Sequence, residues 1–184
     1  VARLARILDE IVPLITPSEQ QLLIVTSGAV GLGRMRLGLS GSLTLAARQA
    51  CSAIGQSVLI QNYNIILSRF DLMAGQILIS SEDFSHDKRR HNLLATIKEM
   101  EKFSVVPVIN ENDVVSTEEL ESTSNHHSPS FSSSHSFGDN DRLSALLATE
   151  VGAELLVILT DSEGIYLQKP TQENDLPLNW VDDF

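Results

Sequence analysis

Four short polar segments contain the residue types that are suited to chemistry: TSGAVG at 26–31, NEND at 110–113, FGDND at 137–141 and TDSEGIY at 160–166. Hydroxyls, carboxamides and carboxylates bind ammonium groups, carboxylates and phosphate-bound metals, and small residues let backbone N–H groups approach an anion. Each segment adjoins an apolar or helical stretch. Because ligands in an open α/β sheet bind beyond the carboxyl ends of the strands, we expect a site for a small charged ligand there.

The first segment combines a hydroxyl with glycines between an apolar run and a helical stretch. Ser27 can donate a hydrogen bond to a carboxylate or phosphate, and the start of the following helix favours an anion. A tight turn that needs small residues only for packing explains the segment equally well. Its spacing fits neither the Walker A pattern nor the dinucleotide fingerprint.

The second segment places Asn110, Glu111, Asn112 and Asp113 directly after an apolar run that ends at Ile109. Four polar side chains at the end of a buried strand are costly unless water or a ligand satisfies them. Two carboxamides and two carboxylates can hold the ammonium group of an amino acid and orient its carboxylates. The structural alternative is a capped, solvated loop.

The third and fourth segments precede and follow predicted elements. Asn140 or Asp141 suits the N-cap of a helix that starts at Arg142, but capping needs one such residue, so a ligand-facing turn explains the surplus. Thr160 and Asp161 can contact a nucleotide or its metal, although many strand ends contain this pair.

Apolar spacing predicts the elements that position these segments. Strands are expected at 21–26, 75–80, 105–109 and 155–160, and helices at 1–12, 43–70, 91–103 and 142–151. The order predicts an α/β fold with a mostly parallel sheet and helices on both faces. Since such domains normally begin with a strand, we expect further sequence before residue 1 in the whole protein.

Composition limits the class of protein. The 184 residues carry a formal net charge of −11, which disfavours binding to nucleic acids and anionic membranes. Apolar runs are far shorter than the roughly 20 residues of a membrane span. The single cysteine, Cys51, is better explained as a small buried residue than as a catalytic thiol, and we expect a soluble, cytoplasmic protein.

Residues 121–136 interrupt the alternation of strands and helices with eight serines and three histidines. So few apolar side chains predict a disordered insertion within a single, incomplete domain at 1–184. The histidines could serve as metal ligands, but no cysteine accompanies them and the only acidic residue in the run is Glu121 at its start, so a solvated tract is the better interpretation.

Taken in order, these segments resemble the amino acid kinase family over residues 21–166. The resemblance is closest to its glutamate 5-kinase (γ-glutamyl kinase) branch, which includes the kinase part of δ-1-pyrroline-5-carboxylate synthases. It rests on TSGAVGLGR, RQA with AIGQ, VINEND, FGDNDRLSAL and LTDSEGIY. VINEND together with FGDND is highly specific, whereas TSGA and the Thr-Asp pair are supportive only.

The resemblance implies a three-layer αβα sandwich and phosphorylation of the L-glutamate side-chain carboxylate by ATP, the first step of proline biosynthesis. Ser27, Asp113 and Asn140 would bind glutamate, Thr160 and Asp161 would bind the nucleotide, and Mg²⁺ would bridge the phosphates. The implied partners are a glutamyl-phosphate reductase, fused or separate, proline as a feedback inhibitor, and further copies of the chain in a homo-oligomer.

The chain departs from the family pattern at several places. The two lysine-bearing segments that contact the phosphates in the family fall outside residues 1–184, so the catalytic residues are unassigned and residues 1–184 alone are expected to be inactive. Arg48 stands where a lysine is usual, and His91 where an aromatic residue precedes Asn92. Two alternatives remain: a noncatalytic amino-acid-binding regulatory domain, or a kinase for another acidic amino acid.

Overall fold

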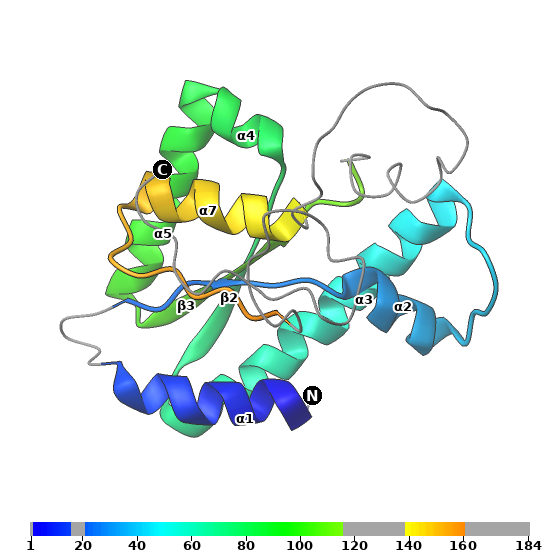
Figure 1. The fold of residues 1–184 in the computed structure, drawn as a ribbon, viewed down its shortest axis with the longest axis horizontal. Helices are drawn as coiled ribbons and strands as arrows, with labels where there is room; N and C mark the ends of the chain where they lie inside the picture. Colours follow the sequence, from blue (N-terminus) through cyan, green and yellow to red (C-terminus); the bar gives the residue numbers. More distant parts are fainter. Residues whose placement is uncertain (1, 16–20, 116–138, 161–184) are drawn as a thin grey trace, which may run out of the picture. The chain divides into compact units, whose positions relative to one another are not determined.

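The computed structural model describes residues 2–15, 21–115 and 139–160 (Figure 1). The chain divides into two compact units, residues 1–153 and 154–184, and all of the helices and strands below lie in the first. Its α-helices are α1 (Ala2–Ile11), α2 (Ala29–Leu37), α3 (Leu45–Leu67), α4 (Ser81–Ser85), α5 (Asp87–Lys102) and α7 (Asp139–Val151). The 3₁₀ turns are η1 (Val12–Leu14) and η2 (Ser68–Phe70), and the strands are β1 (Ile24–Val25), β2 (Met73–Ile79) and β3 (Val105–Glu111).

The three strands form a parallel sheet in the order β1-β3-β2. Ile24 pairs with Val108 on one side of β3, and Gln76 pairs with the same residue on the other side. Six of the seven β3 residues are buried, as expected for a central strand that is covered on both faces. Because all strands run in one direction, their carboxyl ends meet at one edge, which we call the carboxyl edge.

Helices cover both faces of this sheet, as Figure 1 shows. On one face, Val106 and Val108 of β3 pack in a core with residues of α1, η1 and α3, among them Leu59 and Ile66. On the other face, Ile109 packs with residues of α5 and α7. The alternation of side chains along β3 therefore separates two cores, which gives the predicted three-layer αβα arrangement.

Helices α2 and α3 approach each other closely through two glycines. A Cβ on Gly33 would lie 1.8 Å from the carbonyl oxygen of Cys51, and one on Gly55 would lie 1.7 Å from that of Ala29. No other residue type fits at these distances, so the glycines set how closely α2, and the turn that precedes it, sits against α3.

Several sequence predictions are confirmed. The structure has helices at four predicted places, as α1, α3, α5 and α7, and strands at three, as β1, β2 and β3. The fold class is α/β with a parallel sheet, as expected. No helix of the described ranges is long and apolar enough to cross a membrane.

Other predictions were wrong. The apolar run at 155–160 has no strand, and Leu155, Val157 and Leu159 are 78, 61 and 64% exposed. An apolar run becomes a strand only where another strand pairs with it, and spacing alone does not report pairing. β1 is two residues long rather than six, and α7 begins at Asp139 rather than Arg142. The predicted insertion at 121–136 lies outside the described residues.

Candidate functional site

The end of β3 places three polar side chains in a buried position at the carboxyl edge. Asn110, Glu111 and Asp113 are only 4, 7 and 5% exposed. The neighbouring strand holds this segment from one side, because the backbone N–H of Asn112 donates to the carbonyl of Ile79 over 2.9 Å. The alternative of a solvated loop is therefore wrong for Asn110, Glu111 and Asp113, whose side chains are enclosed by protein.

Helix α3 supplies hydrogen-bond donors to this segment. The Ser52 hydroxyl donates to Oδ2 of Asp113, and Gln56 Nε2 donates to the Glu111 carbonyl over 3.3 Å. Gln76 of β2 in turn donates to Oε1 of Gln56 over 3.2 Å. Ser52 and Gln56 are four residues apart and share one face of α3. This rigid helix therefore fixes the conformation of residues 111–113.

Asp113 is the titratable group that this environment perturbs. Burial raises the pKa of its carboxyl group above the ordinary value, and the hydrogen bond from Ser52 partly opposes that shift. A carboxylate that has lost solvation gains most from a nearby cation. An ammonium group at this position would therefore be bound strongly and would stabilise the ionised form of Asp113.

The turn after β1 lies beside the same segment. The backbone N–H of Thr26 donates to the carbonyl of Ile109 over 2.9 Å, and the Tyr63 hydroxyl of α3 donates to Thr26 Oγ1 over 2.9 Å. Ser27 and Gly28 follow and are exposed, and Gly28 has a left-handed conformation with φ of 93° as the N-cap residue of α2. Gly28 has no side chain to cap α2, so the first N–H groups of this helix are suited to an anion.

The start of α7 brings the third segment to the sheet. Helix α7 packs its Leu143 and Leu147 against the sheet face formed by Ile79 and Ile109. Its beginning, drawn in yellow in Figure 1, lies on the side of the carboxyl ends of β1 and β3. Asn140 and Asp141 are half-buried in its first turn. The structural alternative, in which one of them is the N-cap of a helix from Arg142, is wrong because the helix has already begun at Asp139. For the same reason residues 139–141 are helical, and the preferred prediction of a ligand-facing turn is wrong for them.

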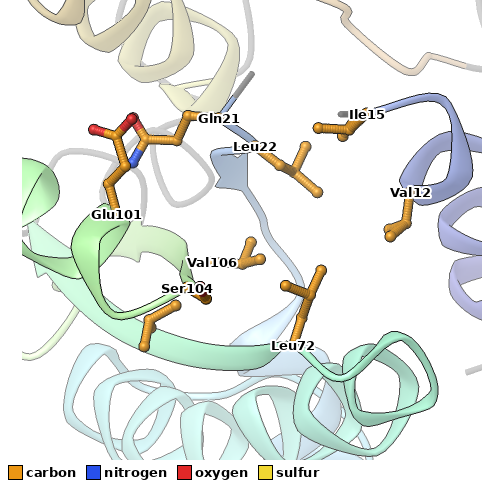
Figure 2. Close-up of a pocket in the computed structure, with 9 residues that line it drawn as sticks. Val12, Ile15, Gln21, Leu22, Leu72, Glu101, Ser104 and Val106 are labelled. Carbon is orange, nitrogen blue, oxygen red and sulfur yellow. The ribbon is translucent and has the colours of Figure 1, made fainter. Parts of the chain in front are cut away.

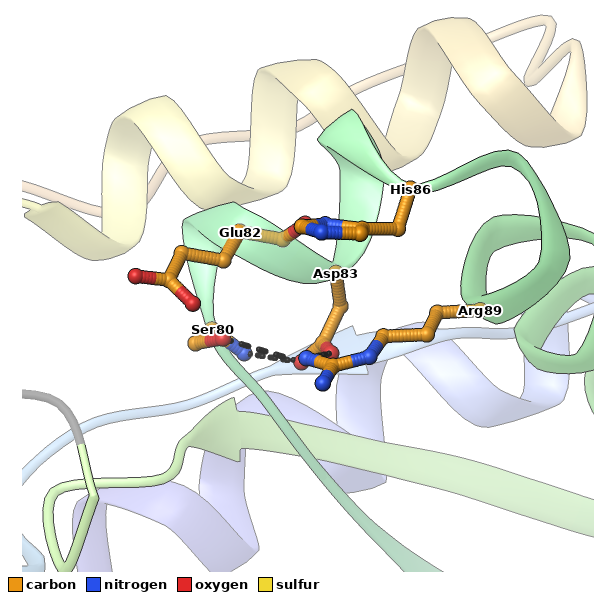
Figure 3. Close-up of polar contacts among 5 residues, drawn as sticks. All are labelled: Ser80, Glu82, Asp83, His86 and Arg89. Carbon is orange, nitrogen blue, oxygen red and sulfur yellow. Dashed lines mark hydrogen bonds and ion pairs between the residues drawn. The ribbon is translucent and has the colours of Figure 1, made fainter.

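At the end of β2, by contrast, the polar residues serve the fold. Figure 3 shows Asp83 accepting hydrogen bonds from the backbone N–H of Ser80 (2.8 Å) and from its hydroxyl (3.0 Å), in a capping box that starts α4. Arg89 forms a 3.1 Å ion pair with the same carboxylate. Burial alone would raise the pKa of Asp83, but the Ser80 hydrogen bonds and Arg89 together hold it below its ordinary value.

Comparison with known proteins identifies the family of this chain. Residues 2–178 match the amino acid kinase family. The chain belongs to that family.

Curated relatives of this amino acid kinase chain bear the name glutamate 5-kinase. The chain is 41% identical over 154 residues to the protein of Bartonella henselae, and 42% identical over 153 residues to that of Agrobacterium fabrum. Each alignment covers 83% of this chain but only 37% and 36% of those relatives. A third relative, from Symbiobacterium thermophilum, is 38% identical over 164 residues, which cover 88% of this chain and 57% of that protein.

In this kinase-family chain, the structure brings three of the four predicted segments to one edge of the sheet. Ser27 and Asp113 follow adjacent paired strands, and Asn140 starts the helix that packs on them. Thr160 is exposed in the second unit, and Asp161 lies outside the described residues. The described residues hold no group of three or more His, Cys, Asp or Glu that is arranged for a metal ion.

Sequence reasoning missed the residues that support Asp113. Apolar spacing marks Ser52 only as part of a long helix, and it gives no sign of the contacts that Tyr63 and Gln76 make. A signal for Ser52 is nevertheless present, because Arg48, Ser52 and Gln56 recur every four residues and form a polar stripe along one face of the helix. Such a stripe predicts that the helix faces other polar groups.

Several arginines that could serve as cations have structural partners. Arg34 donates from Nε to the Leu39 carbonyl (3.1 Å) and from Nη2 to that of Gly41 (2.8 Å). Arg89 pairs with Asp83, and Arg90 joins α5 to α7 through Glu150 over 3.3 Å. These contacts favour a role in holding loops and helices over a role at the phosphates.

A separate pocket lies at the opposite end of the sheet. It has a cavity volume of about 80 Å³ and is lined by Val12, Ile15, Gln21, Leu22, Leu72, Glu101, Ser104, Val105 and Val106 (Figure 2). Leu72 and Ser104 precede β2 and β3, so the pocket is at the amino ends of the strands. Among its described lining residues, Glu101 alone is charged. We place the site at the carboxyl edge because ligands bind there in parallel sheets.

Proposed function

We propose that the whole protein transfers the γ-phosphoryl group of ATP to the side-chain carboxylate of L-glutamate, giving γ-glutamyl phosphate and ADP. Membership of the amino acid kinase family supports phosphoryl transfer, and the name shared by the curated relatives supports glutamate as the acceptor. The observation that carries the proposal is Asp113, a buried carboxylate held by Ser52 at the carboxyl edge.

In this proposal Asp113 binds the ammonium group of glutamate. Its carboxylate has lost water to burial, so a charge-assisted hydrogen bond to the ammonium group is stronger there than at the surface. Ser27 and Asn140 supply a hydroxyl and a carboxamide for the substrate carboxylates. Three groups from three different segments would fix the orientation of a small amino acid that carries two carboxylates and one ammonium group.

The turn at Ser27 and Gly28 would receive the phosphoryl group. The first N–H groups of α2 and the positive end of its helix dipole favour negative charge at that point. Thr160 and Asp161 would contact the nucleotide, and Mg²⁺ bound to the ATP phosphates would neutralise part of their charge.

The chemistry needs no covalent intermediate on the protein. One oxygen of the glutamate side-chain carboxylate attacks the γ-phosphorus, the bond from phosphorus to the bridging oxygen breaks, and ADP leaves with the electron pair. The described residues contribute by positioning: Asp113 fixes the amino acid, and the α2 turn holds the phosphoryl group in line with it.

We further propose the setting that the resemblance implies. The product is an acyl phosphate, which hydrolyses readily, so a glutamyl-phosphate reductase that is fused or separate would consume it in proline biosynthesis in the cytoplasm. Proline is proposed as a feedback inhibitor and a homo-oligomer as the assembly.

The test compares two identical substitutions in the full-length protein. Asp113→Asn removes the charge that holds the ammonium group, and we expect kcat/KM for glutamate to fall at least about 30-fold, which corresponds to roughly 2 kcal/mol. Asp71→Asn is the matched control, because Asp71 is exposed and its left-handed conformation (φ 57°) suits asparagine. Equal turnover of glutamate by both variants would show that Asp113 does not bind the substrate.

A further inference from the structure

Ser52 occupies an unusual environment for a serine in the middle of a helix. It lies within α3 and is only 1% exposed. A buried helical serine usually returns its hydroxyl hydrogen bond to the carbonyl one turn earlier. Here the hydroxyl instead donates across the interior to Oδ2 of Asp113, which is 61 residues away in the sequence.

This contact orients the Asp113 carboxylate. A hydroxyl bound to Oδ2 fixes the plane of the carboxylate and leaves Oδ1 as the acceptor for a ligand. Burial raises the pKa of Asp113, and the Ser52 hydrogen bond works in the opposite direction, toward the ionised form that binds a cation. Gln56, one turn later on the same face of α3, anchors the Glu111 carbonyl and holds the backbone two residues before Asp113.

We propose that Ser52 is a positioning residue for glutamate binding, which acts by holding the Asp113 carboxylate in the orientation that receives the substrate ammonium group. The proposal rests on the proposed function, because it assigns Asp113 to the ammonium group. Ser52 itself does not touch the substrate. An alanine at 52 would suit the helix at least as well, so the hydroxyl is explained by Asp113 rather than by helix stability.

The kinetic test uses the full-length protein and separates the two substrates. Ser52→Ala should raise the KM for glutamate about tenfold, as expected for the loss of a hydrogen bond to a charged group, and leave the KM for ATP within about twofold of the parent. Ser57→Ala is the matched control, since Ser57 is exposed on the same helix, and it should change neither constant. Ser52→Thr, which keeps the hydroxyl, should restore most of the glutamate affinity.

A double substitution shows whether the effect passes through Asp113. In the Asp113→Asn background, Ser52→Ala should add less than about twofold to the loss in kcat/KM for glutamate, because the carboxylate that it orients is already gone. Three results would overturn the proposal: an unchanged KM for glutamate in folded Ser52→Ala, an equal rise in the KM of both substrates, or loss of the fold, which would assign Ser52 to stability.

A measurement without substrate distinguishes this proposal from the proposed function. Absence of glutamate-dependent ADP release by the parent protein would refute the function. Urea unfolding of the two single variants and the double variant would then still test the contact. If the shift in the double variant differs from the sum of the two single shifts, Ser52 and Asp113 are energetically coupled, which supports the contact. Additive shifts would refute it.

Discussion

Replacing Gly55 by alanine tests the close contact between α2 and α3 most sharply. The new Cβ would lie 1.7 Å from the Ala29 carbonyl oxygen and 2.8 Å from the Gly33 nitrogen, and both neighbours are backbone atoms that cannot rotate away. Since ordinary contact begins at 3.4 Å, α2 must move by about 1.7 Å. The start of α2 carries the Ser27–Gly28 turn, so this turn would move with it.

The free-energy terms have opposite signs and the steric term is larger. Alanine in place of glycine inside a helix gains about 1 kcal/mol through propensity. Overpacking of a filled interior costs roughly 1–3 kcal/mol and more where backbone must shift. We therefore expect Gly55→Ala to destabilise the fold by about 1–2 kcal/mol. Gly31 lies inside α2, and a Cβ there would meet no neighbouring atom within 4 Å, so Gly31→Ala should gain about 0.5–1 kcal/mol.

Urea unfolding of the full-length protein measures both substitutions. The midpoint should fall for Gly55→Ala and rise for Gly31→Ala, although the chemical change is the same in both. Hydrogen exchange of the α2 and α3 amides should accelerate in the first variant only. A midpoint that rises in both variants would refute the close helix contact and the position that it gives to the α2 turn.

Two further stability predictions follow from side-chain hydrogen bonds. Asp83→Ala removes the capping box of α4 and should cost about 1 kcal/mol at pH 7 by urea unfolding. The pKa of Asp83 in the folded protein is below its ordinary value. Its contribution to the free energy of unfolding is therefore present above the unfolded pKa and is lost as pH falls through the folded pKa. A cost of the substitution that is equal at pH 7 and pH 3 would contradict this account. Tyr63→Phe removes the donor to Thr26 Oγ1 and should cost about 1 kcal/mol, seen as a lower Tm, and an unchanged Tm would show that the bond does not hold the β1 turn.

The sequence predicted those parts of the fold that depend on local pattern. Apolar spacing predicts burial directly in α3, where Leu59, Tyr63, Ile66 and Leu67 are buried. The apolar run that forms β3 predicts burial in the same way. Pairing is different, because it depends on a partner elsewhere in the chain. The run at 155–160 has the composition of a strand, yet no strand forms there.

The position of the candidate site could be predicted from the sequence, but the residues that hold it in place could not. Asn110 to Asp113 stood out because four polar residues follow an apolar run, and the structure shows that three of them, Asn110, Glu111 and Asp113, are buried at the carboxyl edge. The contact of Ser52 with Asp113 joins residues 61 positions apart, which depends on how α3 lies across the sheet. The start of α7 was misplaced because Asp139, Asn140 and Asp141 all suit an N-cap, and composition alone does not choose among them.

The most direct test of the central claim is ADP release by the full-length protein with ATP and Mg²⁺, in which L-glutamate, L-aspartate and N-acetyl-L-glutamate are offered separately. The account predicts release that depends on glutamate, with kcat/KM at least about 100-fold higher than for aspartate or N-acetylglutamate, because Asp113 requires a free ammonium group and the site fixes the distance to the reacting carboxylate. A preference for aspartate or for N-acetylglutamate, or release that is independent of any acceptor, would contradict it.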